Sequence, residues 1–155
     1  MATAACKGAA KRLLRCFCGC MEMTEDEVQR IYRLSTQATL IDRQATKLLR
    51  SYLQLKRSGD KSEAEQFLDI YEKCGEYATQ ENCGILTLDE LDELCDLGLP
   101  YHMEKELKLV IQTGECSNIE RCLLRIQGEC RNEIEASQEY KDYKSAILDK
   151  LRNKV

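Results

Sequence analysis

Three cysteines at alternate positions follow a cluster of basic residues near the N-terminus. The cysteines are Cys16, Cys18 and Cys20, and the basic residues are Lys7, Lys11, Arg12 and Arg15. Cysteines beside a basic amphipathic segment are the setting for S-acylation, and an acyl chain combined with basic residues holds a protein on a membrane. We therefore predict lipidation of these cysteines and contact of the basic residues with a membrane surface.

The same thiols offer an alternative use as metal ligands. Zinc sites usually place two to four residues between cysteine ligands, whereas a single residue separates these cysteines. His102 is the only histidine available to complete such a site. We therefore expect no zinc at this position.

Residues 1–21 have the pattern of an amphipathic helix that lies on a membrane. On a helical wheel Leu13, Leu14, Phe17 and Met21 share one face, and basic residues flank that face. The alternatives are an unstructured tail or the first helix of a bundle.

No other part of the chain has the spacing of a catalytic motif. Acid–base and nucleophilic catalysis need a base near a nucleophile, and His102 has no informative partner among ten cysteines. Gly75 and Gly84, the closest pair of glycines, are too far apart for a phosphate-binding loop. We expect a protein that is not an enzyme.

The charge distribution and the cysteines of the chain indicate which kind of partner and which cellular compartment to expect. Residues 1–20 carry a net charge of +4 within a chain of net charge −4, so the body is acidic. An acidic body disfavours binding to a phosphate backbone, and we expect no nucleic-acid partner. No apolar run approaches the roughly 20 residues of a membrane span, and no apolar signal-peptide region is evident. We expect thiols in a reducing compartment: a cytoplasmic protein, or one peripheral on the cytoplasmic face of a membrane.

Helical periodicity runs through residues 24–155, and no stretch alternates as a half-buried strand would. Four capping boxes predict helix starts, at Thr24 with Glu27, Ser62 with Glu65, Thr87 with Glu90, and Ser117 with Glu120. Gly98, Pro100 and Gly114 predict helix ends. The prediction is an all-α fold, a single compact domain of six to seven short helices over residues 23–155. A basic, cysteine-rich segment, residues 1–22, precedes it as the anchor.

Residues 64–99 contain an amphipathic run, a polar turn, the segment GILTLDEL and a second amphipathic run. This pattern resembles the helix–loop–helix of the EF-hand superfamily, to which calmodulin and myosin light chains belong, and the likeness covers about residues 64–126. Aligned on the glycine of the loop, the calcium-loop positions fall on Thr79, Glu81, Cys83, Gly84, Ile85, Thr87 and Glu90.

The resemblance implies a degenerate EF-hand. Thr79 and Cys83 stand where calcium loops usually have Asp or Asn, so we expect the calcium site to be lost. The alternative is an ordinary helical bundle, in which Gly84 is a turn residue and Thr87 with Glu90 is only a capping box.

What the resemblance implies for function is a light-chain-like adaptor that binds the amphipathic helix of a partner, and the acidic body suits a basic helix. The alternative is a helical adaptor docked on a membrane through residues 1–21, or a cysteine-rich accessory protein of a pathogen without EF-hand ancestry. We expect no bound cofactor, neither calcium nor zinc.

Overall fold

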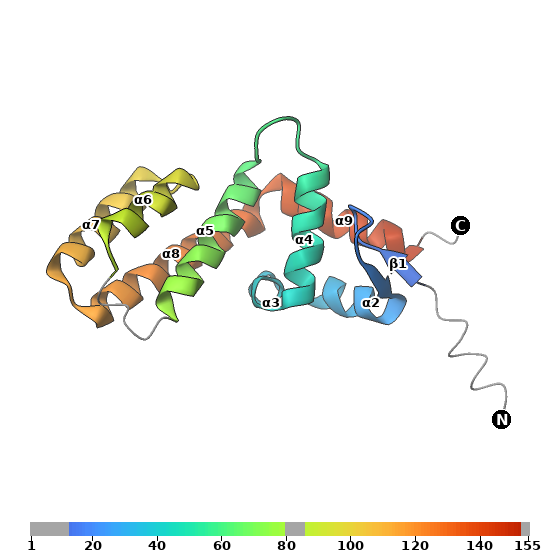
Figure 1. Ribbon diagram of the computed structural model, residues 1–155. Coiled ribbons are helices and arrows are strands. Elements are labelled where there is room, and N and C mark those ends of the chain that lie inside the picture. The colour runs from blue at the N-terminus through green and yellow to red at the C-terminus, as the bar shows by residue number, and fades with distance from the viewer. Residues whose placement is uncertain (1–12, 80–85, 153–155) are drawn as a thin grey trace, which may run out of the picture. The chain divides into compact units, whose positions relative to one another are not determined.

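The computed structural model describes residues 13–79 and 86–152, which form eight helices and one two-stranded hairpin (Figure 1). The predicted all-α class is therefore confirmed. The described helices fall into two compact units. Residues 1–60 with 138–155 form the unit we call the N-terminal unit, and residues 61–137 form the unit we call the central unit.

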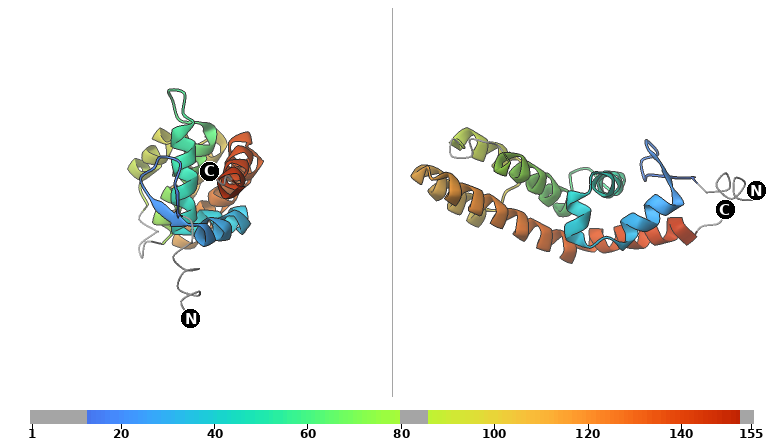
Figure 2. Two further views of the ribbon diagram at one scale, coloured as in Figure 1. Left: turned by 90° about the vertical axis from the view of Figure 1, so that its right-hand side faces the viewer. Right: turned by 90° about the horizontal axis from the view of Figure 1, so that it is seen from below.

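The N-terminal unit combines the hairpin with four helices. Its elements are β1 (Leu13–Arg15), β2 (Glu22–Thr24), α2 (Glu25–Arg33), α3 (Thr36–Ile41), α4 (Arg43–Leu55) and α9 (Gln138–Arg152). Helices α2 and α4 both pack against α9, and the right-hand view of Figure 2 shows α2 lying along it. Its buried apolar residues are Cys16, Met23, Val28, Ile31, Leu40, Ala45, Leu48, Leu49, Tyr52, Leu53, Tyr140, Tyr143 and Ile147.

The hairpin overturns the helix predicted over residues 1–21, as far as that segment is described. Strands β1 and β2 pair antiparallel, with Leu14 opposite Met23. Gly19 adopts a φ of +80°, a left-handed conformation that ends any helix and that glycine reaches without steric cost. The pairing also joins residues on both sides of the predicted boundary between residues 22 and 23.

Local helix-start signals match the structure at three of four positions. Thr24 and Thr87 each form a complete capping box, and the Ser62 side chain accepts a hydrogen bond from the Glu65 N–H. The start predicted at Ser117 is wrong, because α8 begins at Cys116 with Glu115 as its N-cap residue. Gly114 reverses the chain with a left-handed φ of +74°, so α8 begins before Ser117 is reached.

The central unit is built from α5 (Glu63–Ala78), α6 (Leu88–Asp96), α7 (Tyr101–Thr113) and α8 (Cys116–Ala136). Helices α5 and α8 pack side by side along most of their length (Figure 1), and α7 packs on both α6 and α8. Between α6 and α7 the N–H of Leu99 bonds to the Leu94 carbonyl, around a left-handed Gly98. This hydrogen bond forms a Schellman motif, and it confirms the helix end predicted at Gly98.

Apolar side chains from all four helices form the core of the central unit. They include Cys74, Cys122 and Cys130, all fully buried thiols. Cysteine behaves here as a small apolar residue. No helix in the described part of the chain is long and apolar enough to span a membrane.

Candidate functional site

The turn between β1 and β2 brings the three N-terminal cysteines together. The Cys16 N–H donates to the Met21 carbonyl at 2.9 Å, and the Gly19 N–H donates to the Cys16 carbonyl at 3.0 Å. These two bonds fold residues 16–21 back on themselves. The guanidinium of Arg15 adds a bond of 3.1 Å to the Gly19 carbonyl across the turn.

The three sulfur atoms form a compact triangle. The Sγ atom of Cys16 lies 3.2 Å from that of Cys18 and 3.4 Å from that of Cys20, and the last two are 2.6 Å apart. Cys16 is buried, whereas Cys18 and Cys20 are exposed. Seven cysteines of the described residues are free thiols, and these three are among them. Cys116 is disulfide-bonded, and none of those seven is its partner.

Hydrogen bonds within the triangle shift the pKa values of Cys16 and Cys20 in opposite directions. Burial opposes ionisation of Cys16, but hydrogen bonds from the Cys18 and Cys20 thiols and from backbone N–H groups outweigh it, lowering the pKa of Cys16 to about 6. The hydrogen bonds that Cys20 makes with Cys18 and Cys16 raise the pKa of Cys20 to about 11. Cys16 thus ionises more readily than Cys20, and hydrogen bonds from its neighbours stabilise its thiolate.

Phe17 docks the cysteine turn on the helices of the N-terminal unit. Its N–H donates to the hydroxyl of Ser51 on α4 at 3.2 Å. Its ring lies 5.0 Å from the ring of Tyr52 in an edge-to-face arrangement, and 6.3 Å from that of Tyr143 on α9. The ammonium of Lys150 lies 4.7 Å above the Phe17 ring. These contacts fix the turn relative to α4 and α9.

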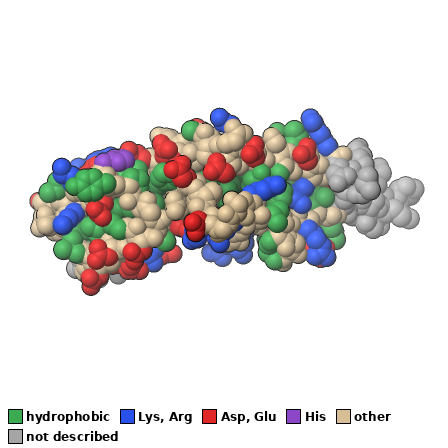
Figure 3. Space-filling model, turned by 90° about the horizontal axis from the view of Figure 1, so that it is seen from above, with side chains coloured by type: hydrophobic (Ala, Val, Ile, Leu, Met, Phe, Trp, Pro, Cys, Tyr) green, Lys and Arg blue, Asp and Glu red, His purple; other side chains and the backbone are tan. Residues whose placement is uncertain are grey.

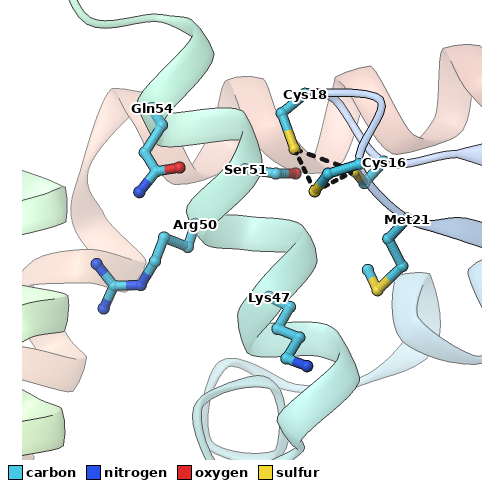
Figure 4. Close-up of a pocket in the computed structure, with 8 residues that line it drawn as sticks. Cys16, Cys18, Met21, Lys47, Arg50, Ser51 and Gln54 are labelled. Atoms are coloured by element: carbon cyan, nitrogen blue, oxygen red, sulfur yellow. Dashed lines mark hydrogen bonds between the residues drawn. The ribbon is translucent and has the colours of Figure 1, made fainter.

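A pocket of about 400 Å³ opens beside the sulfur triangle (Figure 4). Its lining consists of the three cysteines with Met21, Lys47, Arg50, Ser51 and Gln54. Figure 4 shows Ser51 directed from α4 toward the cysteines, with Lys47 and Arg50 on the same helix. Sequence reasoning did not connect these α4 residues with the cysteines, because they are about 30 residues apart in the chain and only tertiary packing brings them together.

Of the predicted membrane-surface basic residues, Arg15 lies in β1 and is exposed, next to the 61% exposed Leu13. Lys7, Lys11 and Arg12 lie outside the described residues. The lipidation predicted at Cys16, Cys18 and Cys20 concerns the thiols of the triangle, of which Cys18 and Cys20 are solvent-accessible.

The described positions of the predicted calcium loop take part in helix capping. The Thr79 hydroxyl donates to the carbonyls of Gly75 and Glu76 at the end of α5. One carboxylate oxygen of Glu90 accepts the Thr87 N–H at 2.9 Å at the start of α6. Glu81, Cys83, Gly84 and Ile85 lie outside the described residues.

A second, smaller pocket lies between α6 and α7 in the central unit. It has a volume of about 230 Å³ and is lined by Leu88, Leu91, Asp92, Glu104 and Lys108. Leu91 is buried, whereas Leu88 is 45% exposed. The Glu104 carboxylate accepts a hydrogen bond of 2.7 Å from the thiol of Cys95. Burial, reinforced by this carboxylate, raises the pKa of Cys95 to about 12 and keeps it a neutral thiol.

His102 occupies an exposed position at the start of α7. Its Nε2 atom lies 3.6 Å from a carboxylate oxygen of Glu129 on α8, which is also partly exposed. A surface pair of this kind contributes little to stability. The contact that the structure gives His102 is thus with a carboxylate and not with a thiol.

The two units carry opposite charge. The central unit has eighteen acidic and seven basic residues, a net charge of −11, and the N-terminal unit has nine acidic and sixteen basic residues, a net charge of +7. The chain total of −4 conceals this separation, because it sums two large charges of opposite sign.

Comparison of the chain with protein-family models, with curated proteins and with solved structures finds no significant match.

Proposed function

We propose that the protein is a non-catalytic adaptor whose central unit binds a basic amphipathic helix of a partner protein. The observation that carries the proposal is the α6–α7 pocket, a depression lined by two leucines and three charged residues within a strongly acidic unit. An amphipathic helix binds by inserting apolar side chains into such a depression, and complementary charges orient it.

Helix α6 supplies the acidic surface. It contains five acidic residues and no basic one, and four of the five are exposed. The acidic residues are Asp89, Glu90, Asp92, Glu93 and Asp96. A surface of one charge attracts a ligand of opposite charge and raises the rate of encounter.

Apolar side chains lie exposed near this acidic surface. Leu88 reaches the pocket from α6, and on α7 Tyr101 is 74% and Leu109 is 59% exposed. Figure 3 shows apolar and acidic side chains side by side in the part of the surface that carries the histidine. Mixed apolar and acidic character suits a basic amphipathic helix better than a purely ionic ligand.

The experiment uses a fluorescently labelled model peptide of Leu and Lys in which Leu recurs at helical spacing. Binding to the full chain is followed by fluorescence anisotropy at about 0.15 M salt, where long-range attraction is screened. A peptide of the same composition with its Leu residues scattered is the control. We expect the amphipathic peptide to bind at least about tenfold more tightly, because only it presents a continuous apolar face.

Two charge-reversal variants locate the binding surface. Asp92→Lys changes the pocket, whereas Glu133→Lys changes an exposed residue of α8 that does not line it. Both alter the net charge of the central unit equally. We expect Asp92→Lys to weaken binding by about tenfold or more and Glu133→Lys by less than about threefold. Equal effects of the two variants, or equal binding of the two peptides, would refute the pocket as the docking site.

Calcium has no part in this proposal, which does not depend on EF-hand ancestry. The expected affinity for the peptide is the same with calcium and with a chelator, because Glu90 is engaged in the α6 capping box. Membrane docking by an acylated N-terminal segment is the alternative predicted from the sequence. It requires the thiols of Cys16, Cys18 or Cys20.

A further inference from the structure

The spacing of Cys16, Cys18 and Cys20 does not by itself bring three sulfur atoms to one point. On an α-helix Cys18 would project about 200° away from Cys16, toward the opposite side. In an extended strand the three would share one face at intervals of about 6.6 Å, too far apart to share an ion. The turn centred on the left-handed Gly19 brings all three ligand atoms within 4.8 Å of one another.

The observed triangle is slightly smaller than the one that a single tetrahedral metal ion needs. A circle through the three sulfurs has a radius of about 1.8 Å, given their separations of 3.2, 3.4 and 2.6 Å, and this is shorter than the zinc–sulfur bond of about 2.3 Å. An ion equidistant from all three therefore lies about 1.4 Å out of their plane. Ideal tetrahedral geometry separates sulfurs by about 3.8 Å, and the exposed side chains of Cys18 and Cys20 have room to open by this amount.

The surroundings suit the charge of such a complex. Three thiolates with one divalent cation carry one net negative charge. Lys47 and Arg50 line the pocket beside the sulfurs and provide compensating positive charge. Among the described residues no further Cys, His, Asp or Glu joins the three-cysteine group. The fourth position of a tetrahedral ion therefore faces the pocket of about 400 Å³.

We propose that Cys16, Cys18 and Cys20 bind one thiophilic divalent cation of the zinc class through three thiolates, with the fourth position open to water or an exogenous ligand. Binding exchanges thiol protons for the cation and releases those protons to solvent. The ion cross-links the turn that Phe17 docks on α4 and α9, so it also stabilises the N-terminal unit. A thiolate bound to the ion is not available for acylation, so this site excludes simultaneous lipidation of the same cysteines.

The test is a metal titration of the full chain, reduced and stripped of metal with a chelator. Cobalt serves as the spectroscopic probe, because thiolate coordination produces a charge-transfer band and tetrahedral geometry produces visible d–d bands. We expect one equivalent of cobalt to generate both and one equivalent of zinc to abolish them. The expected dissociation constant for zinc is below about 100 nM, the range of cysteine-rich zinc sites.

Single serine substitutions identify the ligands. We expect Cys16→Ser, Cys18→Ser and Cys20→Ser each to weaken zinc binding by more than about 100-fold, because changes outside the ligand set already cost 10–100-fold. Cys95→Ser removes a partly buried thiol of the central unit and is the matched control, with an expected change below about threefold. Circular dichroism of each variant checks that the helices are retained.

Three results would overturn the proposal or a part of it. Zinc affinity unchanged by the three cluster substitutions would show that the tight site lies elsewhere. An acyl chain released by hydroxylamine from any of the three cysteines, in protein isolated from eukaryotic cells, would show that lipidation prevails. A 100-fold loss on Cys6→Ser would overturn the open fourth position and assign it to the chain itself.

Discussion

Replacing Phe17 by Ala tests whether side-chain packing, and not backbone bonding alone, holds the cysteine turn in place. Phe17 makes an edge-to-face contact with Tyr52 at 5.0 Å, worth about 1 kcal/mol, and a longer one with Tyr143 at 6.3 Å, worth about 0.5 kcal/mol. The Lys150 ammonium 4.7 Å above the ring contributes about 0.5 kcal/mol. Transfer of the half-buried ring from water contributes about 1 kcal/mol more.

These contributions amount to about 3 kcal/mol for Phe17→Ala, and to about 2 kcal/mol for Phe17→Leu, which keeps apolar volume but loses the ring contacts. The assay is amide hydrogen exchange on reduced, chelated protein at the N–H groups of Cys16 and Gly19, which bond within the turn. For Phe17→Ala we expect protection of both amides to fall by about 100-fold, or completely if the turn opens more readily than that.

Phe67→Leu is the matched control, since Phe67 is the other phenylalanine of the chain and belongs to the central unit. It should leave protection of the Cys16 and Gly19 amides unchanged. If Phe17→Ala changes their protection by less than about threefold, the ring contacts do not hold the turn, and the reasoning from aromatic packing fails.

Further substitutions test the packing of both units. Asp42→Asn removes an ion pair with Arg30, whose hydrogen bond holds the pKa of Asp42 below its usual range. Because the folded pKa is depressed, the carboxylate stabilises the fold above its unfolded pKa near 3.9, and this contribution is lost as pH falls through the folded pKa. We expect thermal melts to show a cost of about 0.5 kcal/mol at pH 7 that shrinks as the pH falls below about 3.9; a difference that does not change as the pH falls would contradict the assignment. Lys144→Met removes an ammonium that donates to the carbonyls of Tyr32 and Leu34 at the end of α2, and urea denaturation should show a loss of about 1–2 kcal/mol, against almost none for the exposed Lys141→Met. Gly98→Ala forces a side chain onto a backbone with φ of +104° and should cost about 1–2 kcal/mol, whereas Gly128→Ala inside α8 should stabilise by about 0.5–1 kcal/mol; equal melting temperatures for the two variants would refute the argument.

Sequence reasoning succeeded where the determining interactions are local. The boxes at Thr24 and Thr87 join groups three residues apart, so their residue types alone predict the helix starts. The helix ends at Gly98 and Gly114 are also predictable from the residue types, because they too depend on interactions between residues close in the sequence. Ser117 shows the limit of such signals, because the tight reversal at Gly114 began the helix earlier than its capping pattern predicted.

The candidate sites depended on contacts that no local pattern encodes. The positions of Leu13, Leu14 and Phe17 on a helical wheel predict a helix, yet these residues form a strand and a docked turn. The separation of charge between the two units likewise depends on the unit boundaries after residues 60 and 137, which the packing of the helices decides.

The amino-acid sequence by itself determined that the chain is all-α and where most helices begin and end, because periodicity and caps act within one or two turns of backbone. Only the tertiary structure decided that Cys16, Cys18 and Cys20 converge. Their convergence requires the left-handed turn at Gly19, and Phe17 docks that turn against Tyr52 and Tyr143, which are 35 and 126 residues further along the chain. Contacts over such separations form only when the whole unit has folded, and the geometry of the three thiols is a consequence of that packing.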